Sequence, residues 1–441
     1  MKKDKTQSVK SAAKNVIMTI DMGGSKTKIV VQSLSDNSPQ VLLMDSQLAD
    51  VGKLSLDSVP TDGRNSDRAW VGFASNNDDN EYIYYAVGAL ARNRFGGLPQ
   101  LHELKYELAL PKILAAIWLA RAELALPSKF NLFLSVLLPS GEMSDKDILK
   151  SRIIKAATTF ETPDGKLNIK LAACEVSSEG SGIYTYRKSV LGDKFYDRRQ
   201  LYVMLGFRNA SAFVVRGGVV EPGITSDFGM YWMLDLLATR VSGLDKNNPV
   251  TSEIIANSVH SPELLKKLSR KRSQQDIDTD FESITTAVTI TKDEYVRAVV
   301  RWLKSVGGEF DVNAVCPQDE IVFCGGTAEY LRGELDKHYA STELVWHGGV
   351  SVPSEFESKL GGYRLADVWS LHEAFSSLVI SKLNGITSKK RSAADSNAGS
   401  NSTYQSVVPS IGSGGNSDKS VGMFEYKRVE RPSGTMPPIV N

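Results

Sequence analysis

The chain contains 441 residues, of which 41% are hydrophobic and 23% are charged, a composition typical of a soluble globular protein with more than one domain. Its 52 basic and 51 acidic residues exclude a global positive field that would hold the protein on nucleic acid or an anionic membrane. The three cysteines show no zinc spacing and the first residues no apolar leader, so we expect reduced thiols, no structural metal and a cytoplasmic location.

The first predicted element is a β-hairpin. Residues 1–14 are rich in Lys and Ser and are expected to form a flexible extension. Asn15 to Ile20 then show a β-branched pattern typical of a strand, which ends in Asp21, and the β pattern resumes from Lys28 to Gln32. The turn between these strands holds the first candidate chemistry.

This turn has the composition of a phosphate-binding loop. Gly23 and Gly24, followed by Ser25, allow backbone N–H groups to approach phosphate oxygens closely. Asp21 could hold magnesium through water, and Lys28 could reach a phosphate as a point charge. An ordinary hairpin with solvated lysines explains the same segment equally well.

The next two segments differ sharply in polarity. From about Ser33 to Gly97, clusters of Asp, Asn and Gly surround short aromatic strands, which indicates an exposed insertion rather than core. Leu104 to Leu126 is the most apolar stretch, interrupted by charges that include Lys105 and Lys112, and Pro111 is well placed to begin a helix. We therefore expect a buried core helix here and not a membrane span.

Continuous apolar runs predict the strands of the central sheets. Phe130 to Leu138 suits a strand buried on both faces, and Leu201 to Leu205 and Ser211 to Arg216 are two more strands. Glu142 follows just past the carboxyl end of the first of these strands, the usual place for catalytic groups in α/β folds. A lone Glu after a proline is, however, more often part of a solvated loop.

A strand, glycine turn and helix are predicted further along the chain. Glu320 to Cys324 is a buried strand that runs into Gly325 and Gly326, and a helical pattern starts at Ala328. Two glycines at this point would let the backbone lie flat against an adenine and a ribose. A generic strand-to-helix turn remains an alternative.

The composition changes abruptly after about Thr387, where Ser, Asn and Gly dominate. We expect a disordered tail over residues 387–441. Within it, Val421 to Val429 mixes aromatic and charged residues, and this segment is either a short contact for a partner or simply disordered.

Taken together, three segments resemble motifs of the ParM and StbA plasmid-segregation proteins, a branch of the actin superfamily. They are Asp21 to Lys28, Leu138 to Glu142 and Ile321 to Glu329, and the resemblance covers roughly Asn15 to Asn384. It implies an α/β chain with the actin-like ATPase fold, in which two RNase H-like α/β domains flank a nucleotide cleft.

The resemblance also implies domain boundaries. The first domain is expected over residues 15–200, with an outer insertion at about 33–110. The second is expected over residues 201–386, with an outer insertion at about 241–290 and a last helix that returns to the first domain.

The resemblance assigns roles to the candidate site residues. Asp21 to Lys28 becomes the first phosphate loop, and Gly325, Gly326 and Glu329 become the adenosine motif. Glu142 corresponds to the family's catalytic Glu, which positions the attacking water. The implied cofactors are ATP or ADP with Mg²⁺, and Asp21 would hold the metal through water.

The second phosphate loop departs from the family pattern. The family's Asp-x-Gly-Gly-Thr-Thr stands here as Met204-Leu205-Gly206-Phe207-Arg208-Asn209, in which Gly206 is the clear match. Loss of the second carboxylate removes a partner for magnesium or for the water nucleophile, although Arg208 and Asn209 could still hydrogen-bond phosphate oxygens. We expect nucleotide binding with slow hydrolysis.

The resemblance implies a protein that polymerises head to tail into filaments when it binds nucleotide. It also implies an adaptor that links the filament to DNA or membrane. Plasmid segregation and a role in cell shape both stay open. The alternatives are a small-molecule kinase of the same superfamily, for which the sequence shows no convincing acceptor base, and a monomeric nucleotide sensor. An Hsp70-like chaperone fits less well, because no β-rich pattern follows Asn384.

Overall fold

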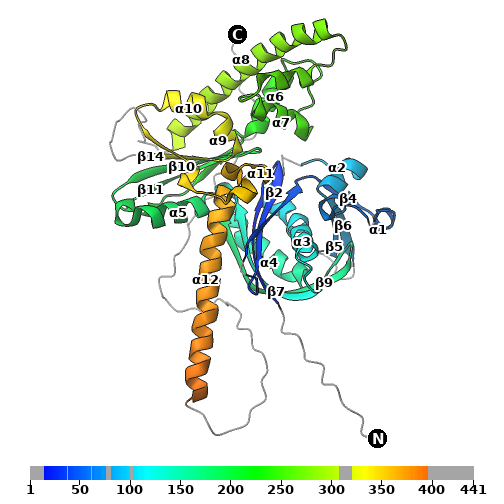
Figure 1. Ribbon diagram of the computed structural model, residues 1–441, viewed down its shortest axis with the longest axis vertical. Helices are drawn as coiled ribbons and strands as arrows, with labels where there is room; N and C mark the ends of the chain where they lie inside the picture. The colour runs from blue at the N-terminus through cyan, green and yellow to red at the C-terminus, as the bar shows by residue number, and fades with distance from the viewer. Residues whose placement is uncertain are drawn as a thin grey trace.

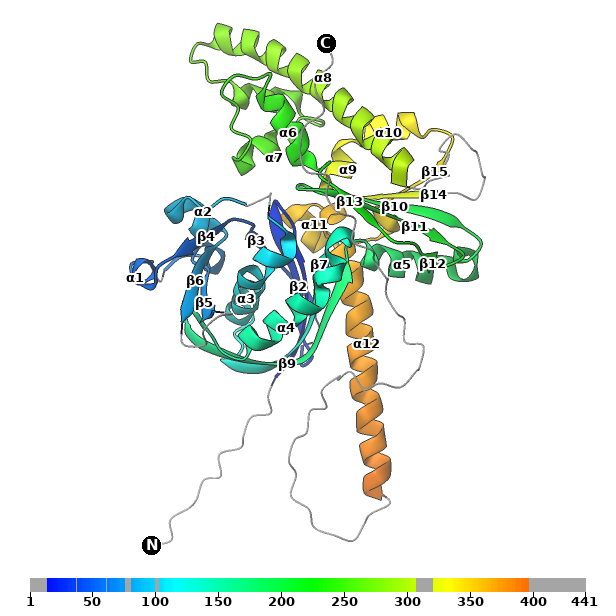
Figure 2. The ribbon, with the colours of Figure 1, turned by 180° about the vertical axis from the view of Figure 1, so that it is seen from behind.

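The computed structural model describes residues 14–36, 38–60, 62–75, 81–99, 103–306 and 320–395. In this part of the chain the strands form two sheets, each with its own helices, and the long helix α12 (Gly362–Asp395) runs from their junction (Figures 1 and 2). Cys174 and Cys324 are free and buried, whereas Cys316 lies outside the described residues. The predicted extension up to residue 13 and the predicted tail from residue 396 also lie outside them.

The first sheet contains nine strands within the described residues, in the order β3-β2-β1-β7-β9-β8-β5-β6-β4. These strands are β1 (Asn15–Met22), β2 (Lys26–Ser33), β3 (Gln40–Asp45), β4 (Leu48–Val51), β5 (Trp70–Ala74), β6 (Tyr82–Val87), β7 (Lys129–Leu138), β8 (Phe160–Thr162) and β9 (Gly165–Ser178). The predicted hairpin is present, with Asp21 opposite Lys28. Because β7 pairs parallel with both β1 and β9, Asp21 and the ends of β7 and β9 meet at one sheet edge.

Helices cover this sheet and fill its curl, as both ribbon views show. They are α1 (Lys53–Leu56), α2 (Ala89–Phe95), α3 (Lys105–Glu123) and α4 (Lys146–Ala157), with the 3-10 helices η1 (Asn65–Asp67) and η2 (Ser140–Asp145). In α3 a continuous run from Ala109 to Ala120 is buried, so this helix is the centre of the first core, as its apolar sequence predicts. Among the described helices, none combines the length and apolarity that a membrane span requires.

The start of α3 differs from the prediction. The helix begins at Lys105, and Pro111 lies inside it rather than at its first turn. An internal proline costs about 3 kcal/mol. The turns before it carry Ala109 and Leu110, which are both buried, and the burial of this face offsets the cost.

The polar segment from Ser33 to Gly97 is less exposed than its composition indicates. It supplies β3 to β6, and Val71, Phe73 and Val87 belong to the same hydrophobic core as α3. The segment therefore extends the first sheet, and the prediction of an insertion outside the core is wrong for these strands.

In the described part of the chain, the second sheet runs β12-β11-β10-β14-β15, and β13 pairs with β11. Its strands are β10 (Arg199–Leu205), β11 (Ala210–Arg216), β12 (Val219–Val220), β13 (Ile224–Ser226), β14 (Glu320–Cys324) and β15 (Glu343–Trp346). β10 pairs parallel with β14 and antiparallel with β11. The three buried strands predicted for this half of the chain are thus confirmed, and Gly206 and Gly325 follow neighbouring parallel strands.

Most helices of the second half gather on one side of this sheet, with α5 on the other (Figure 1). They are α5 (Ser181–Leu191), α6 (Met230–Ala238), α7 (Pro249–Asn257), α8 (Gln274–Val306), α9 (Gly326–Tyr330), α10 (Arg332–His338) and α11 (Ser354–Leu360), with the 3-10 helices η3 (Gly192–Phe195), η4 (Pro262–Leu268) and η5 (His347–Gly349). The predicted insertion at 241–290 comprises α7, η4 and the beginning of α8.

Helix α12 packs against both sheets. Its Ala366 lies in a core cluster with Phe213 of the second sheet, whereas Phe375 and Val379 pack with Ile17 of the first sheet. The helix continues to Asp395, past residue 387 where composition predicts the tail, because Lys, Arg and Ala in this segment favour helix.

Candidate functional site

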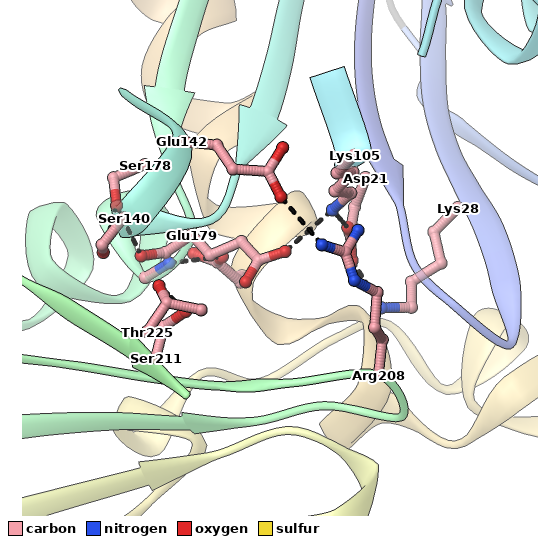
Figure 3. A network of polar contacts seen from close by, with 12 residues as sticks. Asp21, Lys28, Lys105, Ser140, Glu142, Ser178, Glu179, Arg208, Ser211 and Thr225 are labelled. Atoms are coloured by element: carbon pink, nitrogen blue, oxygen red, sulfur yellow. Dashed lines mark hydrogen bonds and ion pairs between the residues drawn. The ribbon is translucent and has the colours of Figure 1, made fainter. Parts of the chain in front are cut away.

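Loops from both sheets line a cavity of about 210 Å³. Most of the predicted site residues line it, namely Asp21, Gly23, Gly24, Ser25, Lys28, Gly206, Arg208, Asn209, Gly325 and Gly326. Glu142 and Glu329 do not. The fold therefore assembles three glycine-bearing turns that are far apart in sequence around one space. Figure 3 shows Glu142 beside Arg208, which lines this cavity.

The hairpin turn of the first sheet is tightly wound. A Cβ on Gly23 would lie 2.7 Å from the carbonyl oxygen of Lys26, so the turn needs glycine at this position. Lys28 Nζ lies 2.5 Å from Asp21 Oδ2, and Ser25 accepts a hydrogen bond of 2.9 Å from Arg364. Lys28 is thus engaged with Asp21 rather than free as a point charge.

Lys105, at the start of α3, joins two carboxylates of the cavity. Its Nζ lies 3.0 Å from Asp21 Oδ1 and 2.8 Å from Glu179 Oε1, and only 8% of the residue is exposed. Burial disfavours both charged forms, but the pairing outweighs it, so the pKa of Lys105 is raised and that of Asp21 is lowered. Lys105 and Asp21 therefore stay ionised at neutral pH.

Lys112 lies seven residues further along α3, on the same face of the helix as Lys105. It is only 5% exposed and lines the cavity, yet its amine has no hydrogen bond or ion pair among the described residues. Burial, with the charges of Lys105 and Arg208, lowers the pKa of Lys112 from 10.5 to about 7. Among the described residues, Lys112 is thus a buried base with no counterion.

Glu142 is fixed by hydrogen bonds in η2. It is buried, its Oε2 accepts a bond of 2.8 Å from the backbone N–H of Tyr106, and its Oε1 lies 3.0 Å from Arg208 Nη2. Arg208 reaches it from the turn between β10 and β11 and itself lines the cavity. The candidate catalytic carboxylate is therefore separated from the cavity by an arginine.

The turn after β14 is constrained by close backbone contact. Gly325 has a φ of 101°, and a Cβ there would lie 2.3 Å from the carbonyl oxygen of Leu205. Thr327 donates a hydrogen bond of 2.8 Å to the carbonyl of Gly206, which ties the two glycine turns together. The carboxyl ends of β10 and β14 are thus held together in the lining of the cavity.

Glu329 lies beyond this turn, outside the lining of the cavity. Its carboxylate lies 2.9 Å from His347 Nε2 and 3.4 Å from Arg332. Burial would raise the pKa of Glu329, but these two partners outweigh it and lower that pKa. In this structure Glu329 holds η5 and α10 together.

Asp367 of α12 also lines the cavity, but its carboxylate is used within the fold. It accepts hydrogen bonds of 2.7 Å from the N–H of Gly180, 2.9 Å from Gly182 and 3.3 Å from Ile183, and so caps the first turn of α5. Burial raises the pKa of Asp367 to about 7 against the lowering effect of these bonds.

Lys105, Lys112, Arg364 and Asp367 were not among the predicted site residues. The two lysines carried a usable signal, because charged residues seven apart in a largely apolar helix share one face and need a polar space or a partner. Arg364 and Asp367 lie on α12, and no local pattern marks either of them.

Asp21, Glu179 and Asp367 line the cavity, but their carboxylates do not fit a magnesium site because each is already paired within the fold. Both oxygens of Asp21 contact ammonium groups, and Glu179 contacts the same Lys105. The turn after β10 offers Arg208 and Asn209, and neither is a carboxylate. Within the described residues no three Asp, Glu, His or Cys side chains are placed to hold a metal ion.

No protein-family model matches the chain, and no curated protein sequence matches it. The fold does match solved structures. The 15-stranded ParM filament from Clostridium botulinum is 14% identical with a TM-score of 0.55, over 82% of this chain and 99% of its own. ParM of Bacillus thuringiensis with AMPPNP is 12% identical with a TM-score of 0.51, over 81% and 98%. An archaeal actin homologue is 12% identical with a TM-score of 0.54, over 82% and 99%.

These likenesses, at such low identities, show the fold. It is the α/β actin-like ATPase fold of the ParM proteins and of the archaeal actin homologue, as the three motifs predict.

Proposed function

We propose that this chain, which has the actin-like ATPase fold, binds ATP or ADP in the cavity between its two sheets and assembles into filaments. The observation that carries the proposal is Lys112, a buried amine without a partner among the described residues, in a cavity lined by three glycine turns. A buried cation without a counterion is unfavourable, and a bound polyphosphate removes that penalty.

The remaining lining supports the same ligand. Backbone N–H groups at Gly23 and Gly24 can approach phosphate oxygens without the obstruction of a side chain, whereas the N–H of Gly206 donates to the carbonyl of Asn209. Gly325 and Gly326 leave room for the backbone to lie against the adenosine. One of the similar structures is a ParM with AMPPNP, which supports a nucleotide in this fold.

Hydrolysis is proposed to be slow. Glu142 is the proposed group that positions the attacking water, but its carboxylate is already held by Arg208 and by the N–H of Tyr106. A carboxylate so occupied is poorly placed to accept a proton from water. We therefore expect nucleotide to control assembly mainly by occupancy, with the bound form favouring the filament.

Assembly is proposed to be head to tail, since such heterologous contacts generate open polymers. The similar structures include a ParM filament. The filament would act in the cytoplasm, through an adaptor that links it to DNA, in plasmid segregation, or to membrane, in a role in cell shape.

Sedimentation with electron microscopy of the pellet tests the proposal. The purified protein is spun with and without ATP, beside Glu142→Ala and the control Lys129→Met, whose lysine is exposed on β7 away from the cavity. We expect wild type and both variants to pellet as filaments only with ATP. ATP binding without polymer would indicate a sensor, and ATP consumption only with a small acceptor would indicate a kinase; either result would contradict the filament proposal.

A further inference from the structure

The cavity contains a cation of its own where an actin-like site would be expected to take a metal. Lys105 bridges Asp21 and Glu179 at 3.0 Å and 2.8 Å (Figure 3). Together with Lys28, which contacts the other oxygen of Asp21, this ammonium balances the charge of two carboxylates that would otherwise attract a divalent ion.

The position of Lys105 is built into the fold rather than adopted by a mobile side chain. The residue is 8% exposed, and α3, which carries it, is the most buried helix of the first core. Lys28 contacts the other oxygen of Asp21 from the opposite strand of the hairpin. Displacing both lysines by a hydrated metal would leave the buried ammonium of Lys105 and the partly buried ammonium of Lys28 without these partners, which is unfavourable.

Two further cations are left over for a ligand. Lys112 has no partner among the described residues, and Arg364, which donates to Ser25, has no carboxylate partner among them. Lys112 lies beside Lys105 on α3, and Arg364 approaches the hairpin turn from α12. Both line the cavity, so the charge that a polyphosphate needs comes from two different elements of the chain.

Resting on the proposed nucleotide binding, we infer that Lys105, Lys112 and Arg364 replace the divalent cation, so that ATP and ADP bind to this chain without Mg²⁺. Lys105 holds Asp21 and Glu179, and Lys112 and Arg364 contact the phosphates directly.

Isothermal titration of the full chain tests this inference, with ATP as the probe in excess EDTA and, separately, in excess MgCl₂. We expect the dissociation constants to agree within about threefold, which is less than 1 kcal/mol. An affinity at least about tenfold weaker in EDTA overturns the inference while leaving nucleotide binding intact. No binding under either condition overturns the proposed function itself.

Variants of α3 sharpen the test. Lys112→Met should weaken ATP binding about tenfold in both conditions, whereas the exposed control Lys129→Met should leave it unchanged. Lys105→Met frees Glu179 and one oxygen of Asp21, so its ATP binding should become dependent on Mg²⁺. An unchanged affinity in Lys112→Met would overturn the inference, and if Lys105→Met does not fold, the comparison of wild type in EDTA and MgCl₂ still decides it.

Discussion

Replacing Lys112 by methionine should make the empty protein more stable. Burial and the neighbouring charges lower the pKa of Lys112 from 10.5 to about 7. At about 1.4 kcal/mol for each tenfold change in proton affinity, that difference corresponds to about 4 kcal/mol of destabilisation at neutral pH. Because the surroundings of a buried lysine relax in part, we expect Lys112→Met to raise the free energy of unfolding by about 2 to 4 kcal/mol.

The sign of the pH dependence follows from the same shift. The folded-state pKa of Lys112 lies below its unfolded value, so the unfolded chain binds the proton more tightly. The penalty is therefore fully present below pH 7 and is lost as the pH rises toward 10.5. The stability difference between Lys112→Met and wild type should shrink by about 2 kcal/mol between pH 7 and pH 9.5.

Urea unfolding followed by tryptophan fluorescence measures both effects, and Lys105→Met is the matched comparison. Lys105 has similar burial on the same face of α3, but its removal leaves Asp21 and Glu179 with one cation fewer. That variant should lose about 3 to 5 kcal/mol. A Lys112→Met protein that is less stable than wild type, or a stability difference that does not change with pH, would refute the reasoning.

Three other predictions concern the cavity. The ATP affinity of wild type should fall as the pH rises above 7, because Lys112 must take up a proton to bind phosphate. Titration calorimetry should show that the affinity of Lys112→Met depends less on pH, and an equal pH dependence in both proteins would contradict this. Gly325→Ala places a Cβ 2.3 Å from a carbonyl oxygen at a φ of 101°, so thermal unfolding should show a loss of stability of more than about 2 kcal/mol. The control Gly333→Ala lies in a helix and its Cβ meets nothing within 4 Å, so its stability should rise by about 0.5 to 1 kcal/mol. Equal effects of the two substitutions would argue against the constrained turn. Glu142→Gln should lower phosphate release by at least about tenfold while pelleting with ATP persists, and an unchanged rate would remove Glu142 from the proposed mechanism.

The sequence predicts those parts of the site whose conformation depends on a few neighbouring residues. A run of β-branched residues meets glycine at three of the site positions, which are Asp21, Gly23 and Gly325. Strand ends of this kind come together at the edge of a parallel sheet. Backbone geometry of this sort depends on a few neighbouring residues, so a single sequence is enough to indicate it. The same reasoning places β7, β10 and β14 within a residue or two.

Local sequence shows that Lys105 and Lys112 share one face of α3, but it does not show what that face meets in the fold. Lys112 becomes part of a site only because α3 is packed with that face toward the second sheet's loops, and Asp367 caps a helix 187 residues away from it. Glu329 matches the family motif in sequence, yet His347 and Arg332 hold it outside the lining. Pro111 indicated a helix start, but burial of the preceding turns carries α3 past it.

The most direct test of the account is a crystal structure of the protein with a non-hydrolysable ATP analogue, prepared in EDTA. The account predicts phosphate oxygens within hydrogen-bonding distance of Lys112 Nζ, between the turns at Gly23 and Gly206, with Lys105 still bridging Asp21 and Glu179. An analogue bound outside this cavity would contradict the account. So would a folded protein whose cavity stays empty at a saturating concentration of the analogue.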